Sequence, residues 1–272
     1  ARPAPVRATL ESISMELRAL GDTGINVSLL GLGTVKFGRN QQVKYPSGFA
    51  IPDDQSVSGL LHLAADLGIN LVDTAPAYGN SQQRLGKLLP GPRDQWVIVS
   101  KVGEIFENGR SRFDFSFHGT LNMVRQSLHD LQTDYIDCVL IHSDGDDLRI
   151  LRQEGVYDAL CELKQQGLIR SHGMSSKTVQ GGLAVVADMD VVMATCNLDY
   201  ADELPVFEAA AAGHKGVLVK KGLMSGHVSG SKGVLASMRH ILAQPGVSSM
   251  IVGTINPDHL SQNVQLLESL TA

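Results

Sequence analysis

The chain has 272 residues, 43% of them hydrophobic and 19% charged, with a formal net charge of −5 at pH 7. A chain of this length can bury one large core. The mild negative charge and the lack of any block of Lys and Arg argue against nucleic acids and anionic membrane surfaces as partners. No apolar run approaches the length needed to span a bilayer. The sequence therefore predicts neither a nucleic-acid nor a membrane partner.

The cysteines and the first residues bear on location and domain organisation. Cys138, Cys161 and Cys196 are scattered, without a CxxC pair or an even framework, which suits a reducing cytoplasm. The opening residues lack the hydrophobic centre of a signal peptide. We expect residues 1–14 to form a mobile tail and residues 15–272 a single domain, without a metal site. The oligomeric state is left open, and a monomer is compatible with the sequence.

A hairpin is expected first, with residues 15–21 and 26–33 as its arms and Gly21 to Gly24 as its turn; its second arm leads into the first strand of the main sheet. Helical stretches, with apolar residues three and four apart, then alternate with short β-branched runs. The further strands are expected at 69–72, 96–100, 136–141, 171–174, 191–196, 216–220 and 249–253. The helices are expected at 57–66, 120–131, 156–165, 206–212, 234–243 and 259–270.

Alternation of strands and helices implies a parallel sheet. Eight such strands, many of them continuously apolar, fit a closed (β/α)8 TIM barrel better than an open doubly wound sheet. The predicted fold is thus a TIM barrel with an N-terminal β-hairpin. Two long connections, residues 37–52 and 102–117, are expected as loops on the catalytic side, where long loops usually carry function.

Polar residues stand at the ends of three predicted strands. Asp73, Lys101 and His142 each come directly after an apolar run, and Tyr78 follows Asp73 on the same loop. Because the C-terminal ends of parallel barrel strands meet on one rim, we expect the four side chains to lie together there. The sequence therefore predicts a catalytic site. Taken singly, each residue has a simpler interpretation, such as a packed loop tyrosine, a solvated lysine, a helix-capping aspartate or a core histidine.

An ordered set of motifs covering residues 17–263 resembles the aldo-keto reductase superfamily. The motifs are Leu30-Gly31-Leu32-Gly33-Thr34, Val72-Asp73-Thr74-Ala75-Pro76-Ala77-Tyr78-Gly79, Ser100-Lys101-Val102, Ile141-His142 and Ile251-Val252-Gly253-Thr254-Ile255-Asn256-Pro257-Asp258-His259. The resemblance implies reduction of small aldehydes or ketones by hydride from a nicotinamide cofactor. Small carbonyl compounds or the corresponding alcohols are then the expected substrates.

In that scheme the catalytic residues are Asp73, Tyr78, Lys101 and His142. Tyr78 gives a proton to the nascent alkoxide, and a nearby ammonium, that of Lys101, is expected to lower the pKa of the phenol. Asp73 holds Lys101 charged and oriented. His142 donates a hydrogen bond to the substrate oxygen or helps to pass the proton.

The resemblance also assigns a cofactor site, in which some positions depart from the family pattern. Ser176 replaces an asparagine that usually binds the carboxamide, Asn197 takes the place of a glutamine, and Lys221 stands where many relatives stack an aromatic ring on the nicotinamide. The assigned cofactor-binding residues are Gly33, Thr34, Lys36, Asp73, Ser175, Asn197, Lys221, Leu223, Ser225, Gly226, Gly253, Thr254, His259, Gln262 and Asn263.

The choice between NADP and NAD depends on the last motif. Relatives that prefer NADP often place a lysine and an arginine there, where this chain has Gly253 and His259. The amides that open the helix at Pro257 can still receive a phosphate. We expect NADP as the cofactor, with NAD as a possible substitute.

Two other functions remain open at this point. One is a cofactor-binding regulatory or sensor barrel with little turnover. The other is a Schiff-base lyase that uses Lys101 as its nucleophile, because a desolvated lysine at a strand end can attack carbonyls.

Overall fold

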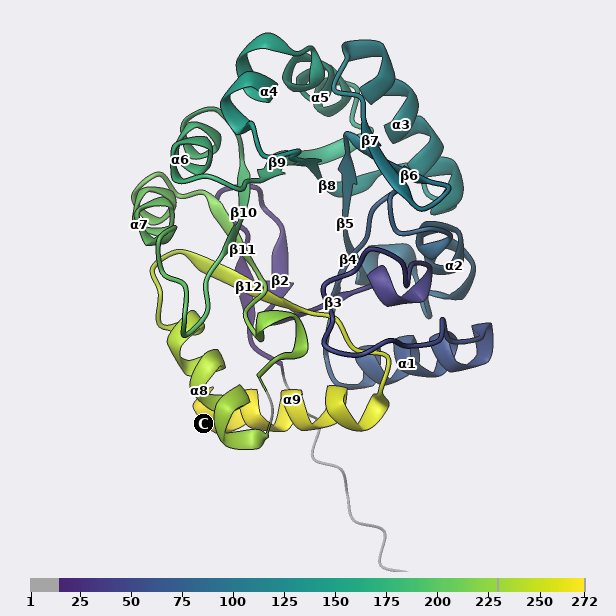
Figure 1. Ribbon diagram of the computed structural model, residues 1–272, viewed down its shortest axis with the longest axis vertical. Coiled ribbons are helices and arrows are strands. Elements are labelled where there is room, and N and C mark those ends of the chain that lie inside the picture. Colours follow the sequence, from purple (N-terminus) through teal and green to yellow (C-terminus); the bar gives the residue numbers. More distant parts are fainter. Residues whose placement is uncertain (1–14, 229, 272) are drawn as a thin grey trace, which may run out of the picture.

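The computed structural model describes residues 15–228 and 230–271. In these residues eight parallel strands close into a barrel, in the order β10–β11–β12–β3–β4–β5–β8–β9 (Figure 1). The predicted (β/α)8 fold is therefore confirmed, while the mobile tail expected over residues 1–14 lies outside the described residues. The barrel strands are β3 (Leu30–Gly33), β4 (Leu71–Asp73), β5 (Val97–Val102), β8 (Ile136–His142), β9 (Ile169–Ser175), β10 (Val191–Thr195), β11 (Gly216–Lys220) and β12 (Val247–Val252).

Helices surround the barrel (Figure 1), and no helix among the described residues is long and apolar enough to cross a membrane. The α-helices are α1 (Asp54–Asp66), α2 (Ser81–Leu88), α3 (Phe117–Asp130), α4 (Asp147–Gln153), α5 (Val156–Gln165), α6 (Val179–Asp188), α7 (Leu204–Ala212), α8 (Ser231–Leu242) and α9 (Pro257–Thr271). The short 3-10 turns are η1 (Val35–Phe37), η2 (Arg93–Gln95) and η3 (Met224–Gly226).

Three of these helices were not predicted from the sequence. Helix α2 is mostly polar, and α4 has only 7 residues, too few to display a clear apolar period. Helix α6 has the adjacent glycines Gly181 and Gly182 in its first turn, and they weaken the helical signal because glycine is a poor helix former. The helices that were predicted are all present: α5 has the predicted ends, and the ends of the others differ by at most three residues.

Alternate side chains along each barrel strand point inward, because successive residues of a strand face opposite sides of the sheet. On β5, Val97 and Val99 belong to the apolar cluster inside the barrel, whereas Ile98 and Val102 belong to the cluster beneath the helices. Continuing this alternation turns Lys101 inward at the C-terminal end of the strand. The same rule places the polar ends of neighbouring strands on the inner surface of the rim.

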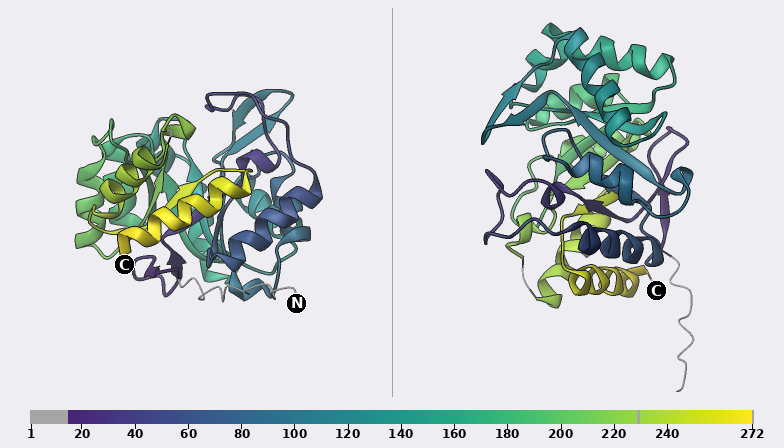
Figure 2. Two further views of the ribbon diagram at one scale, coloured as in Figure 1. Left: turned by 90° about the horizontal axis from the view of Figure 1, so that it is seen from below. Right: turned by 90° about the vertical axis from the view of Figure 1, so that its right-hand side faces the viewer.

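A hairpin closes the opposite, N-terminal end of the barrel. Strands β1 (Leu17–Ala19) and β2 (Asn26–Ser28) pair antiparallel at that end (Figure 2, left). Leu20, Ile25 and Val27 are buried and share the apolar cluster of the barrel interior. The predicted N-terminal hairpin is therefore present, and its apolar side chains fill the end of the barrel that lies away from the polar rim.

A second hairpin stands on the polar rim, where the sequence predicted only a loop. Strands β6 (Glu104–Glu107) and β7 (Arg110–Phe113) pair antiparallel, at the same end of the barrel as the long connection that follows η1 (Figure 2). Their turn is Asn108-Gly109, with φ values of 52° and 75°. Positive φ at both central residues is the type I′ geometry that Asn-Gly favours, so the sequence did contain a signal for this hairpin.

The packing of the first hairpin can be tested by truncating one side chain. Leu20→Ala is expected to lower the free energy of unfolding by about 2–5 kcal/mol, because Leu20 is fully buried and its removal leaves a cavity. Leu17→Ala is the matched control, since Leu17 lies in the same hairpin but is 52% exposed; its effect should stay within about 0.5 kcal/mol. Urea denaturation measures both, and equal losses would contradict a packing role for the hairpin.

Candidate active site

The four predicted catalytic residues come together at the C-terminal rim. Asp73 ends β4, Lys101 lies next to the last residue of β5, and His142 ends β8. These three strands are neighbours in the barrel, so their inward side chains converge. Tyr78 reaches the same place from the loop between β4 and α2.

Lys101 and Asp73 form a buried ion pair. Nζ of Lys101 lies 2.6 Å from Oδ1 of Asp73 and donates a second hydrogen bond, of 3.0 Å, to the carbonyl oxygen of Thr74. Burial alone would lower the pKa of Lys101, but the charge of Asp73 and its hydrogen bond, with a further contribution from Tyr78, outweigh burial and raise that pKa. Lys101 is therefore held as an ammonium, which is unfavourable for the Schiff-base interpretation because that chemistry needs a neutral amine.

Tyr78 is held over this pair by its loop. Its backbone N–H donates to the carbonyl of Ala75, closing a turn. Gly79 follows with a φ of 61°, and a Cβ there would overlap the carbonyl oxygen of Gly38, so the loop is pinned by a close backbone contact that only glycine permits. Nζ of Lys101 lies 4.9 Å from the centre of the Tyr78 ring.

The pKa of Tyr78 differs from the value expected from the sequence. Burial raises it, and although the charge of Lys101 lowers it as expected, burial and the charge of Asp73 outweigh that effect. In the cofactor-free protein Tyr78 is therefore a phenol rather than a phenolate at neutral pH. That state can donate a proton.

His142 contacts Tyr78 edge-on, with ring centroids 6.3 Å apart and an interplanar angle of 89°. Its Nδ1 atom lies 2.9 Å from Oε2 of Glu104, the first residue of β6. Burial lowers the pKa of His142, and the positive charges of Lys101 and Lys220 lower it further, while Glu104 opposes them. Glu104 was not predicted, although its position three residues after Lys101 on the same rim was visible in the sequence.

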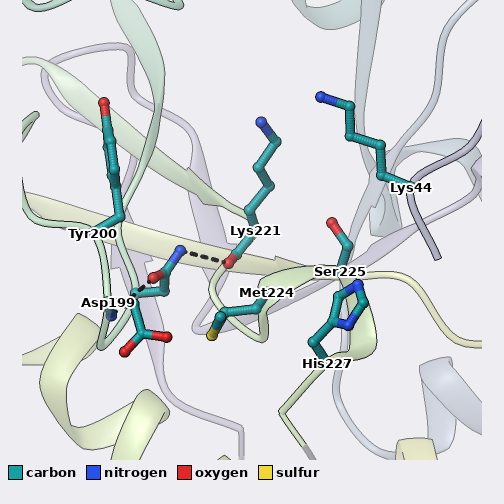
Figure 3. Close-up of a pocket in the computed structure, with 8 residues that line it drawn as sticks. Lys44, Asp199, Tyr200, Lys221, Met224, Ser225 and His227 are labelled. Atoms are coloured by element: carbon teal, nitrogen blue, oxygen red, sulfur yellow. Dashed lines mark hydrogen bonds between the residues drawn. The ribbon is translucent and has the colours of Figure 1, made fainter. Parts of the chain in front are cut away.

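A cationic cavity lies beyond the ends of β10 and β11 (Figure 3). Its volume is about 330 Å³. Lys44 and Lys221 extend along one side of it, and the charge of Lys44 adds to burial in lowering the pKa of Lys221. Such neighbouring ammonium groups favour a bound anion. The lining residues are Lys44, Asn197, Asp199, Tyr200, Lys221, Met224, Ser225 and His227.

The loop under this cavity has an unusual backbone. Lys221, Met224 and Ser225 all have positive φ, between 50° and 58°, which is rare for residues other than glycine and clusters at binding sites. Several of its amides are already used: those of Met224, Gly226 and His227 donate to carbonyls within the loop. An anion in the cavity would therefore be held mainly by side-chain charge.

Comparison with known proteins decides the family. The family model described as "Aldo/keto reductase family" matches residues 29–232. The chain belongs to the aldo/keto reductase family. Its members with solved structures include a Pseudomonas aeruginosa protein classed as an aldo-keto reductase, which is 53% identical, has a TM-score of 0.87, and aligns over 94% of this chain and 96% of its own. The holo form of a Bacillus halodurans aldo-keto reductase has a TM-score of 0.79 at 25% identity, over 94% and 91% of the two chains.

Curated relatives in the family are oxidoreductases. L-galactose dehydrogenase of Arabidopsis thaliana is 28% identical over 94% of this chain and 89% of its own length. The NADH-specific methylglyoxal reductase of Escherichia coli is 32% identical over 58% of this chain and 51% of its own length. The family and these relatives establish the chain as a carbonyl-reducing oxidoreductase and a member of a class that uses nicotinamide cofactors.

The residues assigned to the nicotinamide carboxamide come from the ends of two neighbouring strands, β9 and β10. Ser175 ends β9, next to His142 in register. Its hydroxyl accepts a hydrogen bond of 2.9 Å from Nζ of Lys220, which also donates to the carbonyl of Ser176. Asn197 donates from Nδ2 to the carbonyl of Lys221 at 3.3 Å. Lys220 was not among the assigned cofactor-binding residues, and burial lowers its pKa to about 7.

Further residues assigned to the cofactor, beyond those for the carboxamide, follow strands β3 and β12. Thr34 is buried and bonds the carbonyl of Asp73 through both its amide and its hydroxyl. Lys36 does not face the cationic cavity; its ammonium lies 4.0 Å from the centre of the Tyr45 ring. The Tyr45 hydroxyl oxygen lies close to Gly253. A Cβ atom added to Gly253 would be 3.1 Å from that oxygen.

Helix α9 carries the residues assigned to the adenosine end. His259 and Gln262 are exposed and Asn263 is partly buried. The side chain of Asn256 accepts hydrogen bonds from the first amides of the helix, at 2.9 Å and 3.4 Å. This cap was missed from the sequence, and it occupies amides that were expected to meet a phosphate. The charged and amide groups of the rim fit the phosphates and carboxamide of a nicotinamide dinucleotide, whereas His259 is the only basic residue of α9.

Proposed function

We propose that the chain interconverts small aldehydes or ketones and their alcohols with NAD(P)(H), with Tyr78 as the general acid. The observation that supports this most is the set of contacts around Tyr78, which lies close to both the Lys101–Asp73 ion pair and His142. When bound, the nicotinamide supplies or accepts the hydride.

The four rim residues have separate roles in this scheme. During reduction Tyr78 donates its proton to the carbonyl oxygen, and the Lys101 ammonium stabilises the phenolate that remains. Asp73 keeps Lys101 charged and fixed in position through the 2.6 Å contact. His142 faces the reacting oxygen together with Tyr78.

The cofactor is proposed to lie across the rim from His142 toward α9. Ser175, Asn197 and Lys220 would hold the carboxamide, and Lys44 and Lys221 would face the pyrophosphate. The remaining assigned positions would contact the rest of the nucleotide. We propose NADP as the cofactor, with NAD as a substitute and with only a modest advantage for NADP, because His259 is the sole candidate for the 2′-phosphate on α9.

The proposed substrates are small and polar. The named activities of the relatives, a sugar dehydrogenase and a methylglyoxal reductase, concern small hydroxylated or dicarbonyl compounds. Only 5% of the residues are aromatic, and Phe106 on β6 is covered by the Arg39 guanidinium, 3.6 Å from its ring centre. Aromatic stacking therefore contributes little to the selection of the substrate. A cytoplasmic location is proposed from the free, scattered cysteines.

Tyr78→Phe tests the role of the phenol. The change removes the proton donor with almost no loss of volume, so carbonyl reduction should fall by a factor on the order of 10²–10⁴ while nucleotide affinity stays essentially unchanged. Steady-state kinetics and a cofactor-binding titration measure the two quantities. Turnover like that of the wild type would remove Tyr78 from the mechanism, and loss of cofactor affinity would indicate a structural role instead.

His259→Arg tests whether the residue at position 259 determines the preference for NADPH over NADH. A permanent charge on α9 should raise the ratio of kcat/KM for NADPH over NADH by on the order of tenfold, because a charged hydrogen bond to the 2′-phosphate is available only to NADPH. His129→Arg, an exposed substitution on α3, is the control and should leave the ratio unchanged. A large NADPH preference in the wild type that His259→Arg does not alter would show that another residue reads the phosphate.

A further inference from the structure

Lys220 ends β11 and donates hydrogen bonds to two uncharged oxygens. Its Nζ atom lies 2.9 Å from Oγ of Ser175 and 2.5 Å from the carbonyl oxygen of Ser176. An ammonium group has three hydrogens, so one remains for a ligand. That ligand is the carboxamide oxygen of the nicotinamide in the function proposed above.

The protonation state of Lys220 is set by burial and by the charges that face it. Burial has the largest effect and lowers the pKa. Two neighbouring lysines lower the pKa further, while two carboxylates oppose this and raise it, and the resulting pKa is about 7. The charged and titratable groups that face Lys220 are Glu203 before α7, Asp147 on α4, Lys221 on β11's own loop, Lys177 after β9, and His142 on β8.

One of these carboxylates, that of Asp147, reaches Lys220 through a single peptide group. Oδ2 of Asp147 accepts a hydrogen bond of 2.9 Å from the backbone N–H of Lys177. The carbonyl of the same peptide group, that of Ser176, accepts the hydrogen bond from Lys220. Because the N–H and C=O of a trans peptide point in opposite directions, the carboxylate and the ammonium lie on opposite sides of it. Hydrogen bonds at the two ends of one peptide group polarise it and strengthen each other.

The Asp147 carboxylate is itself held firmly between two loops. Its Oδ2 also accepts hydrogen bonds of 2.8 Å from both the N–H and the hydroxyl of Thr178, and its Oδ1 accepts one of 2.5 Å from the hydroxyl of Ser143. A Cβ atom added to Gly181 would be 2.2 Å from Asp147, so α6 packs on this side chain at a distance that only glycine permits. Asp147 therefore joins the loop after β8 to the loop after β9.

We propose that Asp147 is a positioning residue that holds the Ser176 carbonyl against Lys220, favours the ammonium form of Lys220, and so makes cofactor binding at this rim dependent on pH. This inference rests on the proposed function, since it takes Lys220 as a ligand of the carboxamide. Asp147 acts through the peptide group and has no contact with the cofactor in this scheme.

The protonation state of Lys220 changes how well it binds a carboxamide. At a pH below its pKa of about 7, Lys220 offers a charged donor with a free hydrogen. At a higher pH the amine has lost the charge and one hydrogen, so it is a weaker donor. The affinity for the cofactor should therefore fall as the pH rises through the Lys220 pKa. Bound cofactor favours the ammonium in turn, so binding above that pH should take up a proton.

The link between Asp147 and Lys220 can be measured without cofactor by NMR of protein that carries ¹³C-labelled lysine. The Lys220 signal is assigned by its loss in Lys220→Met, and its titration midpoint in the wild type should lie near pH 7. Asp147→Asn keeps the size of the side chain and removes its charge, so the midpoint should fall. Asp146→Asn, at the adjacent and exposed position, is the matched control, because asparagine caps α4 equally well; its midpoint should equal that of the wild type.

A second measurement uses the wild type and therefore does not depend on the folding of a variant at Asp147. The backbone ¹⁵N signal of Lys177 should shift with the same midpoint as the Lys220 signal, because Lys220 donates to the carbonyl of that peptide group. A Lys177 signal that does not follow Lys220, or an unchanged Lys220 midpoint in folded Asp147→Asn, contradicts the proposal whether or not the protein binds a cofactor.

The consequence for binding is measured by titration with NADH, since His259 is proposed to contact only the 2′-phosphate of NADPH. The affinity of the wild type should fall as the pH rises through the Lys220 pKa, and Asp147→Asn should bind NADH up to about tenfold more weakly at neutral pH. Lys220→Arg keeps its charge over this range and should remove most of the pH dependence. An affinity for NADH that is independent of pH in the wild type would contradict the proposal, whereas no binding of NADH or NADPH at any pH would contradict the proposed function.

Discussion

Lys101 and Asp73 hold opposite charges 2.6 Å apart in a place where both side chains are almost fully buried. Removing two such groups from water costs several kcal/mol each, and only a close, well-oriented pair offsets that cost. Asp73 thereby keeps Lys101 charged, and Lys101 sets the electrostatic field at Tyr78. Taking away either partner would leave a buried, uncompensated charge and cost about 3–5 kcal/mol. The chemistry proposed for Tyr78 thus depends on a pair that never touches the reacting carbon.

The barrel supplies this pair without special backbone geometry. Asp73, Lys101 and His142 sit on three adjacent strands, and the alternation of a strand turns each inward at the same end. The apolar N-terminal hairpin fills the other end. The elements that differ most from a plain barrel, the β6–β7 hairpin and the left-handed loop at Lys221, are both on the rim, where they add Glu104 and the cationic cavity to the site.

Most elements whose signal is local in the sequence were predicted correctly. The barrel strands and the longer helices were predicted because their apolar periods are local properties. Helix α6 was missed because Gly181 and Gly182 weaken its helical signal. The β6–β7 hairpin was missed although Asn108-Gly109 is a local turn signal.

Within the candidate site the same distinction holds. The tetrad was predictable because each member follows a strand, so fold alone brings the residues together. The contacts of Glu104 were not, since Arg39 and Ser111 reach it from separate segments of the chain. The lowered pKa of Lys220 and the net raised pKa of Tyr78 likewise arise from burial, which appears only once the barrel is closed.

The proposed reaction at this rim is the transfer of a hydride between a nicotinamide cofactor and a small carbonyl compound, with the side chains of the rim moving the proton. The most direct measurement uses reduced cofactor deuterated at the transferring C4 position, with a panel of small aldehydes, and follows the label by mass spectrometry of the products. The expected result is loss of the reduced-cofactor absorbance and one deuterium on the carbinol carbon of the product alcohol. Aldehyde left unreduced across the panel, or alcohol formed without the deuterium, would contradict it.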